Sequence, residues 1–265
     1  MEPVYRVAEV VLRLPVRNSM RWRVEGIERI PAHGPVLLAS NHISYFDPIA
    51  IGYLTDRAGR RVRFLAKAEL FEKRFMAAVL RRLGHIRVER GRGDAEALDR
   101  AAAALAAGQC VHVFPEGTIS DELEPMAGKT GLARLARAAG VDVLPVGLWG
   151  THRVIPPGEQ KPQRWRTPIV MVLGEPIPVA ADANPREATD RIMAGICAAV
   201  AEARRLYPPP TAGEHDAWWV RRPETARLRS CRGRVAQALL DAEYGPGGRG
   251  CPPDSGGVSR QGQHH

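Results

Sequence analysis

The sequence predicts a single α/β domain built on a largely parallel or mixed β-sheet flanked by helices. Short apolar runs alternate along the chain with longer segments of helical periodicity, which is the pattern of strands joined by crossover helices. The 265 residues, of which 45% are hydrophobic, suffice to bury one substantial core. No apolar run reaches the roughly 20 residues that a membrane-spanning helix needs, so no such helix is expected.

The first half of the domain is expected to alternate strands and helices from residue 21 onwards. In chain order, the predicted elements are strands at 21–26 and 35–40, a helix after Asp47, a strand at 62–66, a helix near 69–83, a strand at 85–88 and a helix from Asp94. Pro48 supports the first of these helices, because proline is favoured in a first helical turn. Asp94 is a favourable N-cap, and Gly108 is a favourable residue for ending the same helix.

The second half continues this alternation and ends at a proline run. The predicted elements are strands at 110–114, 143–148 and 169–173 and helices at 130–139 and 185–206. The three prolines at 208–210 stop any helix, so the folded domain is predicted to span residues 21–207. The Pro/Gly/Arg-rich extension at 208–265 is expected to be largely disordered.

Residues 1–20 are predicted to form an amphipathic helix. Val4, Val7, Val11 and Leu12 recur at helical spacing, and arginines flank this apolar stripe. A helix of that length reaches only about 20 Å, so it can lie in a membrane interface but cannot cross the bilayer. The alternative is a helix packed on the domain's own core, and the sequence does not decide between the two.

The charge of the chain favours anionic partners. The net charge is +9 and the sequence pI is about 9.9. Nucleic acid is the competing explanation, but no nucleic-acid motif is recognisable and only 6% of the residues are aromatic. A membrane leaflet and phosphorylated substrates are therefore preferred to nucleic acid. We expect a peripheral protein at the cytoplasmic face of the cell membrane.

Neither a disulfide framework nor a metal site is predicted. The four cysteines are widely scattered and form no Cys-x-x-Cys pair. His42 and Asp47 lie close together, but their spacing is not that of a helical zinc site, and no Cys/His cluster supplies further ligands nearby.

His42 and Asp47 are candidates for a hydrogen-bonded pair at the end of the strand 35–40. On a regular helix, positions five apart diverge by roughly 140°, so contact between them requires a turn that leads into a helix. An aspartate that accepts from one ring nitrogen fixes the tautomer and leaves the other nitrogen free to take a proton. The pattern thus indicates a general base at His42 oriented by Asp47. The simpler alternatives are a structural histidine and a helix cap at Asp47.

Four ordered sequence blocks resemble a known family. They are HISYFD at 42–47, GHIRVER at 84–90, FPEGTIS at 114–120 and VLPVG at 143–147, with KAELF at 67–71 between the first two. Together they resemble the glycerolipid acyltransferases and, within that family, the 1-acyl-sn-glycerol-3-phosphate acyltransferases. The similarity extends over residues 24–179, and four blocks in the right order are far more specific than any one of them.

The resemblance implies transfer of an acyl group from a thioester to the free hydroxyl of a lysophospholipid. The donor would be acyl-CoA or acyl carrier protein as a co-substrate, with no further cofactor, and the expected acceptor is 1-acylglycerol 3-phosphate. His42 would deprotonate the hydroxyl, with Asp47 as its partner. No covalent acyl-enzyme is required.

The resemblance also indicates which residues bind the acceptor. Arg90 occupies the position to which the family assigns phosphate binding, and its planar guanidinium suits that group. Lys67 would add positive charge at the same rim. Glu116, Gly117 and Thr118 lie at a turn whose backbone N–H groups could bind phosphate or an oxyanion, and Glu116 is expected to order Arg90 or a substrate hydroxyl. The simpler readings are a solvated turn, an ordinary strand-end lysine and a plain turn.

Two departures from the family pattern leave the exact acceptor open. Glu89 stands where aspartate is more frequent, and Ile119 stands where arginine is common. The second change removes a positive charge near the acceptor, which Lys129 and Arg134 are candidates to supply.

Other functions remain compatible with the same residues. A lipid hydrolase or thioesterase could use the His-Asp pair to activate water, and a lipid-binding protein would use no catalysis at all. Glycerol 3-phosphate, a lysolipid of ornithine or a glycolipid could replace the acceptor. A lipid substrate also requires an apolar groove beside His42, for which Tyr45, Phe46 and Leu70 are candidate lining residues, although some of them are expected to be simply core residues.

Overall fold

The computed structural model describes residues 18–72, 74–88, 94–159 and 166–210. The helix predicted at 1–20 falls almost wholly outside the described residues, as does most of the extension predicted at 208–265. Arg90 also lies outside them. Within the described part of the chain, no helix combines the length and the apolar character needed to cross a membrane.

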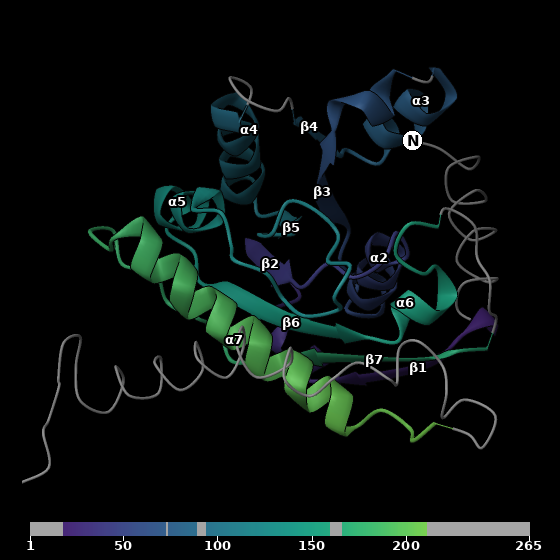
Figure 1. The fold of residues 1–265 in the computed structure, drawn as a ribbon. Coiled ribbons are helices and arrows are strands. Elements are labelled where there is room, and N and C mark those ends of the chain that lie inside the picture. The colour runs from purple at the N-terminus through teal and green to yellow at the C-terminus, as the bar shows by residue number, and fades with distance from the viewer. Residues whose placement is uncertain (1–17, 73, 89–93, 160–165, 211–265) are drawn as a thin grey trace, which may run out of the picture.

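A seven-stranded mixed sheet forms the centre of the domain (Figure 1), with the strand order β1-β7-β6-β2-β5-β3-β4. The strands are β1 (Arg21–Glu25), β2 (Val36–Ser40), β3 (Val62–Lys67), β4 (Ile86–Val88), β5 (Cys110–Val113), β6 (Val143–Trp149) and β7 (Pro168–Leu173). Neighbouring strands are parallel except β6 and β7, which are antiparallel. The predicted α/β fold is therefore confirmed, and each predicted strand is present.

The helices agree with the predicted positions, with two additions. They are α2 (Asp47–Arg57), α3 (Arg74–Arg82), α4 (Asp94–Ala106), α5 (Gly131–Ala139), α6 (Thr151–Val154), α7 (Pro185–Arg205) and the 3-10 helices η1 (Ile27–Arg29) and η2 (Ala68–Phe71). The helix expected near 69–83 is divided into η2 and α3. The sequence pattern predicts neither η1 nor α6, because helices of three or four residues carry no periodic signal.

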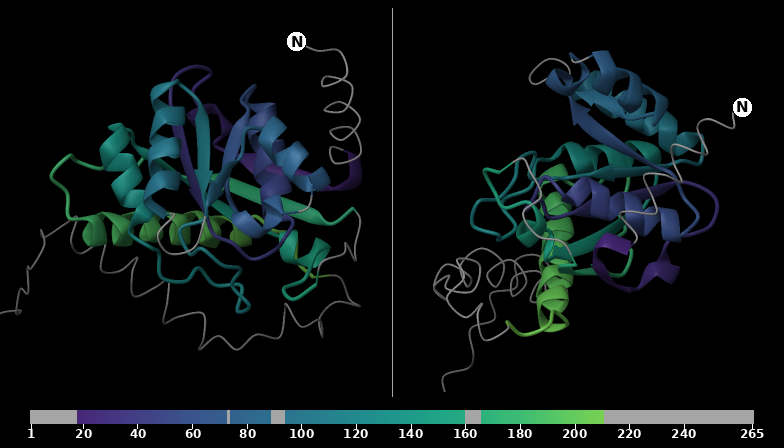
Figure 2. Two further views of the ribbon diagram at one scale, coloured as in Figure 1. Left: turned by 90° about the horizontal axis from the view of Figure 1, so that it is seen from above. Right: turned by 90° about the vertical axis from the view of Figure 1, so that its right-hand side faces the viewer.

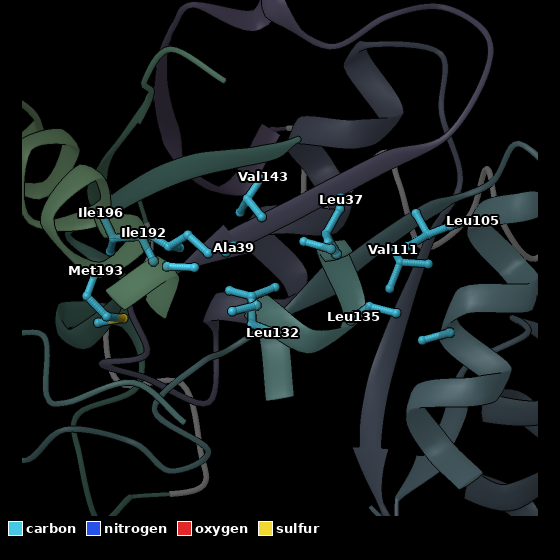
Figure 3. Close-up of a cluster of buried hydrophobic side chains, with 14 of the residues drawn as sticks. Leu37, Ala39, Leu105, Val111, Leu132, Leu135, Val143, Ile192, Met193 and Ile196 are labelled. Atoms are coloured by element: carbon cyan, nitrogen blue, oxygen red, sulfur yellow. The ribbon is translucent and has the colours of Figure 1, made fainter. Parts of the chain in front are cut away.

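Helices cover both faces of the sheet. On one face, α4, α5 and α7 pack on the inner strands, and Figure 3 shows Ala39 of β2, Ile192 of α7 and Leu132 of α5 in this cluster. On the other face, α2 and α6 pack on β1, β2, β6 and β7. All of β2 is buried, so the strand that leads to His42 is enclosed on both sides.

The long helix α7 lies along β6 (Figures 1 and 2). The two elements approach so closely at Gly147 that an added Cβ would lie 2.2 Å from the carbonyl carbon of Ala199, so only glycine fits there. This contact fixes the C-terminal part of α7 against the sheet.

Parallel pairing brings several strand ends to one edge of the sheet. β2 pairs with β5 on one side and β6 on the other, with Ala39 in register with Val113 and Pro145. β3 follows β5, and its last residue, Lys67, is in register with Val88 of β4. Because ligands tend to bind beyond the carboxyl ends of parallel strands, a functional site is expected at the segments that follow β2, β3 and β5.

The cysteines differ in part from expectation. Cys110 is a free, buried residue of β5. Cys197 of α7 is buried as well but is disulfide-bonded, so the expectation that the cysteines form no bridge is wrong at this position. Separation along the sequence is a poor guide here, since a bridge depends on the distance between Cα atoms in space.

Candidate active site

His42 and Asp47 form a hydrogen-bonded pair at the carboxyl end of β2. Nδ1 of His42 lies 2.9 Å from Oδ2 of Asp47. The chain turns between the end of β2 and the start of α2 at Asp47, which is the geometry that the five-residue spacing requires. A carboxylate accepts hydrogen bonds, so Nδ1 carries the hydrogen and Nε2 keeps a lone pair that can take a proton.

The same oxygen of Asp47 also holds the turn. Oδ2 accepts the backbone N–H groups of Ile43 at 2.7 Å and Ser44 at 2.8 Å, and Asp47 is completely buried. Asp47 therefore closes the turn that carries His42 and orients its imidazole through the same atom. Asp47 is the first residue of α2 and its side chain makes no cap hydrogen bond to the helix, so the helix-cap alternative is wrong, whereas its role in orienting a general base stays a prediction.

The His42 ring packs on an aromatic side chain from the neighbouring strand. Phe114, directly after β5, stacks on it with ring centroids 3.9 Å apart and an interplanar angle of 17°. Phe114 in turn meets the ring of His112 edge-on at 4.4 Å. The side chain of His42 is still 15% exposed, so one part of the ring stays accessible. Phe114 limits rotation of the ring without closing the site.

The backbone of His42 is held by the loop that follows β5. Its N–H donates to Oε1 of Glu116 at 2.9 Å, and its carbonyl accepts the N–H of Ser120 at 2.7 Å. The second oxygen of the buried Glu116 accepts the N–H of Met126 at 2.8 Å. Glu116 thus joins two backbone segments at the base of the site, a role that the sequence does not reveal. The expected contact of Glu116 with Arg90 or a substrate hydroxyl stays a prediction.

Gly117, Thr118 and Lys129 lie at the turn beyond Glu116. Gly117 has a φ of +71°, and its N–H donates to the Phe114 carbonyl at 3.1 Å, so this N–H closes the turn and is not left for a substrate. Binding of a substrate by other backbone N–H groups of this turn stays a prediction. Nζ of Lys129 lies 2.9 Å from where a Gly117 Cβ would be, which places the ammonium over this turn. Thr118 is exposed beside it.

Lys67 lies at the same edge of the sheet, whereas Arg90 is not described. Lys67 ends β3, is exposed, and is in register with Val88, two residues before Arg90. The structure thus brings Lys67 to the carboxyl edge, as expected for an acceptor-binding residue.

Of the candidate groove residues, Phe46 belongs to the core. It is 4% exposed and stacks on Trp22 at 6.3 Å, so the expectation that it lines a groove is wrong. Tyr45 and Leu70 are 52% and 48% exposed. Both remain candidates for contact with lipid.

Asn41 is a site-positioning residue that the sequence does not identify. Its side-chain amide donates to the carbonyl of Leu148 at 3.1 Å and accepts the Leu148 N–H at 2.8 Å. This paired contact fixes the end of β2 to β6 immediately before His42. No signal near Asn41 could identify a partner 107 residues away.

The fold and the site define an α/β protein with a hydrogen-bonded histidine and aspartate at the carboxyl end of β2. The sequence model of the acyltransferase family matches residues 21–149, which include β1 to β6 and every predicted site residue. Over these residues the chain is therefore similar to the acyltransferase family.

Individual proteins are consistent with this similarity to the acyltransferase family. The chain is 29% identical over 157 residues to the chloroplast 1-acyl-sn-glycerol-3-phosphate acyltransferase LPAT1 of Arabidopsis thaliana, covering 58% of this chain and 43% of that protein. It is 32% identical over 117 residues to a lyso-ornithine lipid O-acyltransferase of Pseudomonas aeruginosa, with 43% of each chain covered. The matched region thus spans less than half the length of these relatives.

A solved structure extends the similarity to the fold. The 1-acyl-sn-glycerophosphate acyltransferase PlsC of Thermotoga maritima superposes with a TM-score of 0.59 at 27% sequence identity. The superposition covers 72% of this chain and 75% of that one.

Proposed function

We propose that this protein transfers an acyl group from acyl-CoA or acyl carrier protein to the free hydroxyl of a lysophospholipid, with 1-acylglycerol 3-phosphate as the preferred acceptor. The observation that carries the proposal is the 2.9 Å contact between Nδ1 of His42 and Oδ2 of Asp47. It leaves Nε2 on a partly exposed ring as the base that an alcohol nucleophile requires near neutral pH. The names of the relatives support the substrate class.

In the proposed reaction, Nε2 of His42 takes the hydroxyl proton as the oxygen attacks the thioester carbonyl. The tetrahedral intermediate then collapses, the carbon–sulfur bond breaks, and the imidazolium returns the proton to the departing thiolate. Asp47 stabilises the imidazolium while it carries that proton. Both substrates react directly with each other, so no acyl-enzyme forms.

The acceptor's phosphate would be held by the cationic side chains at the same edge. Lys67 ends β3 there, the ammonium of Lys129 lies over the turn at Gly117, and Arg90 follows Val88 by two residues. Charge-assisted hydrogen bonds from such groups are shorter and stronger than neutral ones. Because these cationic side chains come from different segments of the chain, they would bind a phosphate from several directions.

A second acceptor has its own support. The relative from Pseudomonas aeruginosa is a lyso-ornithine lipid O-acyltransferase, and Ile119 stands where arginine is common in the family. An acceptor that carries no phosphate would need fewer cations. A lysolipid of ornithine is therefore the alternative substrate of the same site.

The decisive assay pairs labelled acyl-CoA with a panel of acceptors. We expect rapid thioester loss and a labelled product only with lysophosphatidic acid, and a fall in rate of about 10² to 10⁴ in His42→Ala. His33→Ala is the matched control, because His33 is an exposed histidine outside the site and should leave the rate unchanged. Release of free fatty acid without an acceptor would instead identify a hydrolase. No turnover in the wild type or in His42→Ala, together with equal binding of both to liposomes, would identify a lipid-binding protein.

A further inference from the structure

The loop that follows β5 binds the backbone of His42. Both backbone polar groups of His42 are bound there, the N–H by Glu116 and the carbonyl by Ser120. A displacement of this loop would move the backbone of His42 and with it the imidazole. What holds the loop therefore matters for catalysis, even where it touches no substrate.

Arg204 of α7 makes two contacts with this loop. Nη1 of Arg204 lies 2.7 Å from Oε1 of Glu124, and Nη2 donates to the carbonyl of Leu123 at 2.9 Å. The Ser120 hydroxyl donates to the carbonyl of Glu124 at 2.7 Å. A continuous chain of contacts thus runs from Arg204 through Glu124 and Ser120 to His42.

This ion pair is protected from solvent. The side chains of Glu124 and Arg204 are only 10% and 26% exposed, and the guanidinium lies 4.1 Å from the centroid of the Trp149 ring. Charge pairs with this degree of burial are screened less by water and salt than surface pairs. The fork of the guanidinium also makes its two contacts in a fixed geometry.

The loop backbone is strained at Leu123, between Ser120 and Glu124. Leu123 has a φ of +60°, in the left-handed region that non-glycine residues rarely occupy, and it is 1% exposed. Such a conformation persists only where surrounding contacts enforce it. The hydrogen bond from Arg204 to the Leu123 carbonyl is one of those contacts.

Arg204 is itself attached to a rigid support. It lies in the last turn of α7, whose backbone meets β6 at Gly147, and β6 pairs directly with β2. The loop is therefore held relative to the strand that delivers His42.

We propose that Arg204 is a positioning residue for His42, acting through Glu124, Leu123 and Ser120. The proposal rests on the proposed function, in which His42 is the general base. Arg204 does not contact the reacting atoms, so it should affect the chemical step through the placement of the imidazole and leave substrate binding intact.

The test compares full-length Arg204→Met and Glu124→Gln variants with Arg205→Met. Arg205 is the matched control, because it loses the same charge one residue further along α7 but pairs with Glu202 at the surface. We expect kcat of Arg204→Met to fall about tenfold with KM for donor and acceptor nearly unchanged, since small misplacement of a catalytic group is costly. Glu124→Gln should show a smaller fall. Combining the two should lower kcat no further than Arg204→Met alone, as for coupled residues.

A second measurement separates positioning from loss of stability and does not depend on turnover. Backbone amide exchange at His42 and Ser120 should become faster in Arg204→Met and stay unchanged in Arg205→Met. Unchanged exchange and unchanged kcat in Arg204→Met would overturn the proposal. So would a fall in kcat that matches only the fraction unfolded. If the wild type transfers no acyl group, the proposed function fails, while amide exchange still tests the contact chain.

Discussion

At the scale of single residues, one carboxylate oxygen combines two tasks. Oδ2 of Asp47 accepts hydrogen bonds from Nδ1 of His42 and from the backbone N–H groups of Ile43 and Ser44. The backbone contacts fix where the oxygen lies, and the fixed oxygen then fixes the ring. The contact between His42 and Asp47 is local to the turn, which is why this pair could be predicted from six consecutive residues, whereas the contacts that hold the His42 backbone come from the distant loop after β5.

Asp47→Asn separates these two tasks. An asparagine oxygen in the place of Oδ2 can still accept the two backbone N–H groups and the Nδ1–H of His42, but no negative charge remains to stabilise the imidazolium. We expect kcat to fall by about 10² to 10⁴ while the melting temperature changes little. Steady-state kinetics and a thermal melt check this. Retained activity would reduce Asp47 to a structural residue of the turn.

For the remaining site residues, some locations could be predicted from the sequence and some contacts could not. Gly117 and Lys129 are twelve residues apart and were expected at one site, and the structure places Lys129 over Gly117. The role of Glu116 at the His42 backbone could not be predicted, since it depends on how the loop folds back. The pairing of Glu124 with Arg204 joins positions 80 residues apart without any local signal.

At the scale of elements, the first turn of α2 places apolar side chains in solvent beside the candidate base. Tyr45 just precedes the helix and Ile49 lies within its first turn, and they are 52% and 41% exposed. If the proposed function holds, the product carries two acyl chains and is nearly insoluble, so the site would have to open toward lipid. We propose that this turn of α2 contacts the membrane surface.

The membrane contact can be tested with vesicles of anionic phospholipid. Replacing both side chains by serine should weaken partitioning on the order of tenfold or more, because each fully buried large apolar side chain contributes about 1.5 to 3 kcal/mol. The matched control is Tyr45→Phe with Ile49→Val, which keeps the apolar surface and should bind as the wild type does. Co-sedimentation measures both. Equal binding of the serine variant would exclude this turn as the contact.

At the scale of the whole molecule, alternating periodicity was enough to predict the strands and helices, while their spatial order was not accessible. Apolar runs such as 35–40 and 110–114 signal buried strands wherever they lie in the sheet. The insertion of β2 between β5 and β6, and the antiparallel pairing of β6 with β7, depend on packing between distant segments. The close fit of α7 at Gly147 is equally invisible in a single sequence.

The buried His112 and the partly buried His85 make the stability of the whole domain depend on pH. Burial, with a further contribution from the charge of His42, lowers the pKa of His112 to about 3. Burial and the nearby Arg63 lower the pKa of His85 to about 4. Both are neutral in the folded protein at pH values where the unfolded chain, with an ordinary histidine pKa near 6.5, takes up protons.

The sign of the effect follows from this difference. Above about pH 6.5 neither the folded nor the unfolded state binds these protons, so the full unfolding free energy is present. Below about pH 6.5 only the unfolded chain binds them, so the unfolding free energy falls until the pH reaches the folded pKa values. Each histidine should then cost about 1.4 kcal/mol of unfolding free energy per pH unit. Urea unfolding at pH 7.5, 6.5 and 5.5 should show this decline. In His112→Asn, the slope of unfolding free energy against pH should correspond to about one proton fewer taken up on unfolding. His33→Asn, which alters an exposed histidine, should leave the slope unchanged. An identical slope in His112→Asn would mean that His112 does not stay neutral in the folded domain.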